Sequence, residues 1–153
     1  DSVKTYKKCY KSCSACSDKG NRVDHKCITC NDNYFKTTDN LNNNCYSKEK
    51  KLMHYYYNGV NLFERCYPSC LYCNGKDSDG THNCSICKAG KFFDPESYSC
   101  YSNQEIDQNY YHYGGNRIKK CYDSCKTCNG YGNDNYNNCK ECLNGDSKSM
   151  CYN

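Results

Sequence analysis

Residues that build a hydrophobic core are scarce in this sequence. Ile, Leu, Val and Phe together number 16 of 153 residues, and there is no Trp. A chain so poor in aliphatic side chains does not form one ordinary globular core, and without other support it would be disordered. It also lacks an apolar run near 18 residues, a signal peptide and a lipidation signal, so the sequence predicts no membrane-spanning helix.

Catalytic motifs are missing as well. The sequence has no nucleophile elbow, no phosphate loop and no His–Glu metal motif. Among its four histidines, His25 and His82 stand at the same place in two repeats, where the third repeat has Asn137. Because a repeated active site would repeat its residues, we expect no catalytic residue, no cofactor and no enzyme activity.

Cysteine is abundant instead, at 18 residues, or about 12 per cent, which is typical of a disulfide scaffold. The cysteines form three sets of six in which three, two, ten and two residues separate the first five, and fourteen, twelve or eight precede the sixth. This repetition predicts three modules, at residues 1–54, 55–109 and 110–153, each stabilised by disulfides in place of a core. The sets are Cys9, Cys13, Cys16, Cys27, Cys30, Cys45; Cys66, Cys70, Cys73, Cys84, Cys87, Cys100; and Cys121, Cys125, Cys128, Cys139, Cys142, Cys151.

Disulfides persist in oxidising compartments, so we expect a secreted or cell-surface protein. The chain starts inside a repeat, without the first strand expected in the later repeats. We therefore expect a monomeric fragment of a longer array, with any membrane anchor outside it.

Two kinds of hairpin are expected along the chain. Turn residues Asn58-Gly59 and Gly114-Gly115 lie between short aromatic or apolar runs and predict hairpins at residues 55–63 and 110–118. Further hairpins are expected at residues 34–46 and 92–101, with a shortened form at 143–150, and the ten-residue loops rich in Gly, Asp and Asn predict turns. The expected fold class is a small disulfide-rich protein, mostly short β-hairpins and loops, arranged as an elongated array of three six-Cys modules.

Tyrosine follows the first and the sixth cysteine of every module and none of the twelve others. A tyrosine ring beside a disulfide supplies apolar burial, so we expect these rings to shield the bridges. They are Tyr10, Tyr46, Tyr67, Tyr101, Tyr122 and Tyr152.

The second module resembles a known family through Cys66-Tyr67-Pro68-Ser69-Cys70-Leu71-Tyr72-Cys73-Asn74-Gly75, then Cys84-Ser85-Ile86-Cys87 with Gly90 and Phe92, and the closing Cys100. This order is similar to the furin-like, growth-factor-receptor cysteine-rich repeat. Six cysteines allow 15 pairings, and spacing alone does not choose among them. The resemblance implies bridges from first to third, second to fourth and fifth to sixth cysteine, and a rod of small β-hairpin modules.

The richness in Asn, Tyr and Lys also resembles extracellular repeats of AT-rich eukaryotes, such as ciliate or parasite surface antigens and the scaffoldins of anaerobic gut fungi. In the scaffoldins, repeated modules act as cohesins that dock enzyme-borne dockerins. This second resemblance implies a non-catalytic scaffold with a protein partner.

Metal sites are the main alternative use of these residues. Cys13, Cys16, Cys27 and Cys30 match a four-thiolate zinc pattern, but two further cysteines per module would then lack a role, so disulfides are the preferred prediction and no metal is expected. Calcium is a second alternative, through Asp77-Ser78-Asp79-Gly80 and Asn133-Asp134-Asn135. The first module offers only Asp18 and Asp24 there, so turn formation explains these loops better.

The net charge and one glycosylation motif bear on possible partners and modification. The net charge is +4, and clusters such as Lys48-Glu49-Lys50-Lys51 are interpreted as solvated surface, so no nucleic acid partner is expected. Asn83-Cys84-Ser85 is an N-linked sequon beside a cysteine, and its modification stays open.

The hairpins that lead into the second and third modules are the predicted binding surface for an extracellular protein partner. Three consecutive tyrosines in one strand cannot all face one side, so at least one ring faces solvent or the neighbouring module. The alternatives are a passive stalk or surface-coat antigen, in which these rings only pack the junctions, and a carbohydrate-binding module. The predicted binding residues are Tyr55, Tyr56, Tyr57, Phe63, Tyr110, Tyr111 and Tyr113.

Overall fold

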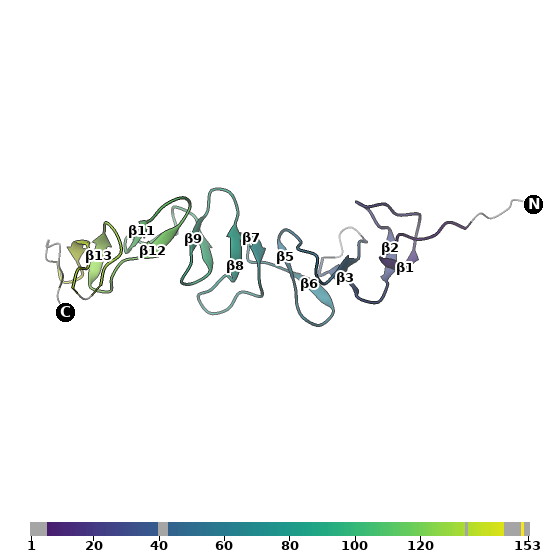
Figure 1. The fold of residues 1–153 in the computed structure, drawn as a ribbon, viewed down its shortest axis with the longest axis horizontal. Coiled ribbons are helices and arrows are strands. Elements are labelled where there is room, and N and C mark those ends of the chain that lie inside the picture. Colours follow the sequence, from purple (N-terminus) through teal and green to yellow (C-terminus); the bar gives the residue numbers. More distant parts are fainter. Residues whose placement is uncertain (1–5, 40–42, 134, 146–150, 152–153) are drawn as a thin grey trace, which may run out of the picture.

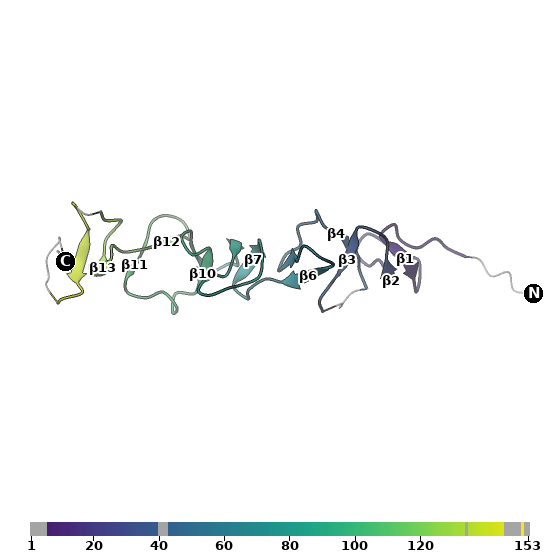
Figure 2. The same ribbon diagram turned by 90° about the horizontal axis from the view of Figure 1, so that it is seen from below.

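The computed structural model describes residues 6–39, 43–133, 135–145 and 151. Over these ranges the chain forms fourteen short β-strands that follow one another along a rod, with β1 and β13 near opposite ends of its long axis (Figures 1 and 2). No helix that could cross a membrane occurs in them. The predicted class of short β-hairpins and loops in an elongated array is confirmed.

A module here means one set of six cysteines with the chain that they bridge, and each module is centred on one hairpin. These hairpins are β1 (Cys13–Cys16) with β2 (Cys27–Cys30), β7 (Cys70–Cys73) with β8 (Cys84–Cys87), and β13 (Cys125–Cys128) with β14 (Cys139–Cys142). All three are antiparallel and carry the same two register irregularities. These strands were not predicted from the sequence.

All eighteen cysteines are bonded, and every bridge stays within its module. The order is first to third, second to fourth and fifth to sixth, which is the pairing that the furin-like resemblance implies. The nine bridges are Cys9–Cys16, Cys13–Cys27, Cys30–Cys45, Cys66–Cys73, Cys70–Cys84, Cys87–Cys100, Cys121–Cys128, Cys125–Cys139 and Cys142–Cys151.

Sulfur forms the interior of each module. Apart from Phe63 and Ile118, every buried apolar side chain in the described part of the chain is a cysteine. Tyr10, Tyr67 and Tyr122, which follow the first cysteine of each module, pack against these sulfur clusters as predicted. Tyr46 and Tyr101 instead contact a histidine in their module, and Tyr152 lies outside the described residues.

The junction between the first two modules is a four-stranded sheet with the order β4-β3-β6-β5. Its inner strands, β3 in the first module and β6 directly before the second, run parallel, with Lys36 opposite Leu62 and Thr37 opposite Phe63. A pairing between strands of neighbouring modules thus joins them without a covalent cross-link. The strands are β3 (Tyr34–Thr37), β4 (Tyr46–Ser47), β5 (Tyr55–Tyr57) and β6 (Leu62–Arg65).

The second junction repeats this design in a lighter form. A parallel bridge joins Phe93 to Arg117, and the Phe93 N–H donates to the Asn116 carbonyl at 2.8 Å. The predicted hairpins are therefore present at both junctions, whereas most of the shortened one at 143–150 lies outside the described residues. The strands here are β9 (Phe92–Asp94), β10 (Ser99–Tyr101), β11 (Tyr110–His112) and β12 (Ile118–Lys120).

Candidate functional site: a groove at the first junction

A groove of about 380 Å³ lies where the first module meets the second. Three elements line it: the linker 48–52, the hairpin β5–β6 and the hairpin β7–β8 of the second module. Its volume falls within the range of pockets that hold small ligands or side chains, about 300 to 1,000 Å³. The lining residues are Lys48, Glu49, Lys50, Lys51, Leu52, Tyr55, Tyr56, Tyr57, Phe63, Tyr72, Cys73, Asn74, Ser85 and Ile86.

The three consecutive tyrosines of β5 have their hydroxyl groups tied back into the protein. The Tyr55 hydroxyl donates to Asp39, the Tyr56 hydroxyl donates to Glu64 at 2.6 Å, and the Tyr57 hydroxyl donates to the Val60 carbonyl at 2.8 Å. Burial, together with the bond to Glu64, raises the pKa of Tyr56 to about 12. The hydrogen bonds hold these rings in place before any ligand arrives, which lowers the ordering cost of binding.

Phe63, another of the predicted binding residues, lies inside the junction. It borders the groove but is only 1% exposed, and its ring centroid lies 5.5 Å from that of Tyr57 and 6.2 Å from that of Tyr46. Its ring packs the junction and has almost no surface left for a partner, because β6 is an inner strand of the four-stranded sheet.

The hairpin at the second junction carries the other predicted binding residues. Tyr111 packs against the sulfur cluster of the third module, and Tyr113 is 39% exposed. One cavity beside this hairpin has a volume of about 70 Å³ and is lined in part by Glu105 and Tyr110. Of the two hairpin faces predicted to bind a partner, the first borders a groove of ligand size.

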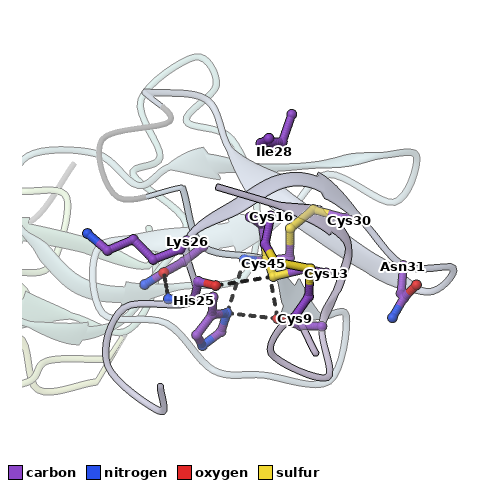
Figure 3. Close-up of a disulfide and its surroundings, with 12 residues drawn as sticks. Cys9, Cys13, Cys16, His25, Lys26, Ile28, Cys30, Asn31 and Cys45 are labelled. Atoms are coloured by element: carbon purple, nitrogen blue, oxygen red, sulfur yellow. Dashed lines mark hydrogen bonds between the residues drawn. A yellow bond between two sulfur atoms is a disulfide. The ribbon is translucent and has the colours of Figure 1, made fainter. Parts of the chain in front are cut away.

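A separate arrangement, which recurs in the other modules, surrounds His25 next to the sulfur cluster of the first module (Figure 3). The ring stacks on Tyr10 at 4.3 Å, and its Nδ1 accepts the backbone N–H of Cys45 at 3.3 Å, with the Ser12 hydroxyl 2.8 Å away. His82 repeats these contacts with Tyr67, Cys100 and Ser69. In the third module the Asn137 Oδ1 accepts the N–H of Cys151.

We call this arrangement the backbone clamp, because each copy holds the amide of the sixth cysteine. A Ser–His pair also occurs in hydrolytic sites, but Ser12 is 1% exposed and the third module uses an asparagine. A buried hydroxyl without substrate access supports structure and not catalysis. Sequence reasoning missed the serines, although Ser12, Ser69 and Ser124 each directly precede the second cysteine.

The clamp predicts that the stability of two modules depends on pH. Burial lowers the pKa of His25 and His82 below the ordinary 6.5, against weaker opposing contributions that include Asp24 at His25, and Glu105 and Asp77 at His82. Below pH 6.5 the unfolded chain therefore binds more protons at these rings than the folded chain does, and stability falls with falling pH.

We expect acidification from pH 7 to about 5 to destabilise the first two modules and to spare the third at its clamp, since Asn137 does not titrate. Urea unfolding followed by peptide-resolved hydrogen exchange measures this. The double variant His25→Asn, His82→Asn should lose the acid sensitivity, while His112→Asn, at an exposed position, should keep it. Equal acid sensitivity of all variants would contradict the clamp.

Metal binding finds little support. The four cysteines of the zinc pattern in the first module are all in disulfides, to Cys27, Cys9, Cys13 and Cys45 in chain order, so they offer no thiolate. No group of three His, Cys, Asp or Glu side chains that could hold a metal ion is found within the described ranges. Asp134, from one of the two candidate calcium loops, lies outside them.

Comparison with known proteins gives one relative. The chain is 31% identical over 141 residues, 90% of its length, to proprotein convertase subtilisin/kexin type 5 of Mus musculus, and the match covers 6% of that protein. No family model matches the chain, and no solved structure matches it significantly. This similarity and the nine disulfides agree, at a coarse level, with a furin-like cysteine-rich repeat. A chain with so many disulfides is typical of proteins that pass through the secretory pathway.

Proposed function

We propose that this chain is a non-catalytic, extracellular protein-interaction module, and that the groove at the first junction is its contact surface. The observation that carries this proposal is a preformed groove of about 380 Å³, lined by tyrosines with tethered hydroxyls, on a rod of bridged modules. Tyrosine is enriched where proteins bind one another, because it gives a large contact area at a low entropy cost.

The lining of the groove suits binding better than chemistry. It contains no histidine, and Glu49 is its only carboxylate. Histidine is the side chain that general acid–base catalysis uses most often, and paired carboxylates are another common arrangement; the lining has neither. The proposed activity is therefore recognition of a partner.

In its most specific form the proposal assigns the chain to a scaffold of the scaffoldin kind, with enzyme-borne dockerins as partners. The support is the array itself, because repeated bridged modules along a rod space several enzymes on one chain. Tyr110, Tyr111 and Tyr113 would then belong to a second, weaker contact at the next junction.

Replacement of an exposed apolar residue in the groove tests this function. Ile86 is 51% exposed and lines the groove, so Ile86→Ser should weaken binding of a purified extracellular partner, with dockerins tested first, about tenfold. Ile28, in β2 of the first module, is 58% exposed and outside the groove, so Ile28→Ser is the matched control. Isothermal titration calorimetry measures both, and equal affinities of the two variants would exclude the groove as the contact.

A passive stalk is the second candidate, and the parallel strand pairing across both junctions favours it. Such pairing stiffens a rod whether or not it binds anything. Absence of binding to every purified candidate, together with an extended shape in small-angle scattering, would favour the stalk.

A further inference from the structure

We propose that the groove at the first junction takes an acidic peptide segment, whose carboxylates meet Lys48, Lys50 and Lys51 while an apolar side chain of the segment packs against Ile86 and the tyrosine rings. This inference rests on the proposed function and names the chemistry of the partner.

The three lysines are available for such a ligand. Lys48, Lys50 and Lys51 are exposed, line the groove, and form no ion pair within the described residues. Six other basic residues do form such pairs, for example Lys26 with Asp24 at 2.6 Å and Lys126 with Glu141 at 3.3 Å. A segment that gathers three unpaired cations along one groove complements negative charge.

The acidic groups around the groove do not cancel this charge. Glu49 is the single carboxylate of the lining. Glu64, on β6, already accepts from the Tyr56 hydroxyl at 2.6 Å and from the Asn58 amide at 3.0 Å. Asp77, in the ten-residue loop of the second module, contributes with its negative charge to the raised pKa of Tyr56, and Lys76 precedes it in the sequence.

The second junction shows that the groove is not a by-product of the repeat. Cys100 stands 55 positions after Cys45 and Cys121 stands 55 positions after Cys66, so the two linkers have equal length. Yet Asn103, Glu105 and Ile106 occupy the places of the three lysines, and Thr127 and Glu141 occupy those of Tyr72 and Ile86. The three lysines and the apolar pair of Tyr72 and Ile86 therefore occur together at the first junction, and the second junction has neither at the matching positions.

The apolar part of the lining favours a peptide over a sugar chain. The hydroxyls of Tyr55, Tyr56 and Tyr57 all donate to partners inside the protein, so these three rings have no O–H left to donate to a sugar hydroxyl group. Ile86 adds an exposed aliphatic surface. An apolar side chain fits these surfaces, and flanking carboxylates reach the lysine wall.

Fluorescence anisotropy with a labelled peptide of alternating glutamate and leucine tests the inference, with a lysine–leucine peptide of equal length as the ligand control. We expect the acidic peptide to bind and the basic one not to. Lys50→Glu with Lys51→Glu should weaken binding about tenfold or more, whereas Lys7→Glu with Lys8→Glu, an equal charge change at exposed residues outside the groove, should leave it nearly unchanged. Added salt should weaken the wild-type complex.

Equal affinity of the two lysine variants would overturn the inference. So would lysine-dependent binding of a heparin oligosaccharide without binding of the acidic peptide, because the occupant would then be a sulfated sugar. A partner that is lost with Ile86→Ser but not with Lys50→Glu and Lys51→Glu would leave the proposed function intact and refute only the acidic ligand.

Discussion

Replacement of Phe63 with alanine is expected to destabilise the first junction by about 3 kcal/mol. The ring is 1% exposed and packs between Tyr46 and Tyr57, and it is one of two buried apolar side chains that are not cysteine among the residues described. Because the ring fills the space between two tyrosines on an inner strand of the sheet, most of the packing energy should be lost. The two modules should then separate and bend relative to each other.

Hydrogen exchange locates this effect. The Thr38 N–H donates to the Phe63 carbonyl at 2.8 Å across the junction and should lose its protection. The Phe93 N–H, bonded to Asn116 at the second junction, should keep it and serves as the internal control. Val60→Ala, at a position 74% exposed in the same hairpin, should change neither amide. Unaltered protection of Thr38 in Phe63→Ala would contradict the coupling role of this ring.

Much of the fold could be predicted because the cysteine spacing limits which loops the disulfides can close. Identical intervals in three copies require similar loops, and Asn58-Gly59 and Gly114-Gly115 supply turn residues, with positive φ at all three glycines. The boundaries 1–54, 55–109 and 110–153 stay predictions, since the hairpin β5–β6 belongs to the second module by sequence and pairs with the first by structure.

Two features of the fold have no local signal. The strands at the Cys-x2-Cys segments contain polar residues such as Ser14 and Thr29, and disulfides, rather than strand propensity, set their pairing. The parallel pairing of β3 with β6 joins residues that are far apart in sequence, and neither segment contains a residue pattern that predicts which strand it pairs with. Pairings of this kind depend on how whole hairpins stack.

The sequence identifies part of the groove lining. It predicts that Tyr55, Tyr56 and Tyr57 contact a partner, and these residues line the groove. The charge pattern alone predicts that the neighbouring lysines are solvated surface. They are exposed, but the linker turns back, with Leu52 bridged to Tyr55, and so the lysines become one wall. Sequence alone could not show that a linker and two hairpins enclose one space.

Loss of the Cys70–Cys84 bridge is expected to unfold the second module. Both sulfurs are 0% exposed, and their module has no buried apolar interior apart from cysteines. The bridge joins residues 14 apart, for which the chain-entropy estimate is about 3 kcal/mol, most of the stability of so small a unit. The double variant Cys70→Ser, Cys84→Ser removes the bridge without leaving a free thiol.

Peptide-resolved hydrogen exchange on this double variant is the most direct test of the claim that bridges within each module replace a common core. We predict that protection disappears across β7–β8 and that the β1–β2 and β13–β14 hairpins keep theirs, because their own bridges are untouched. Loss of protection in all three hairpins at once, or retention of protection in β7–β8, would contradict the claim.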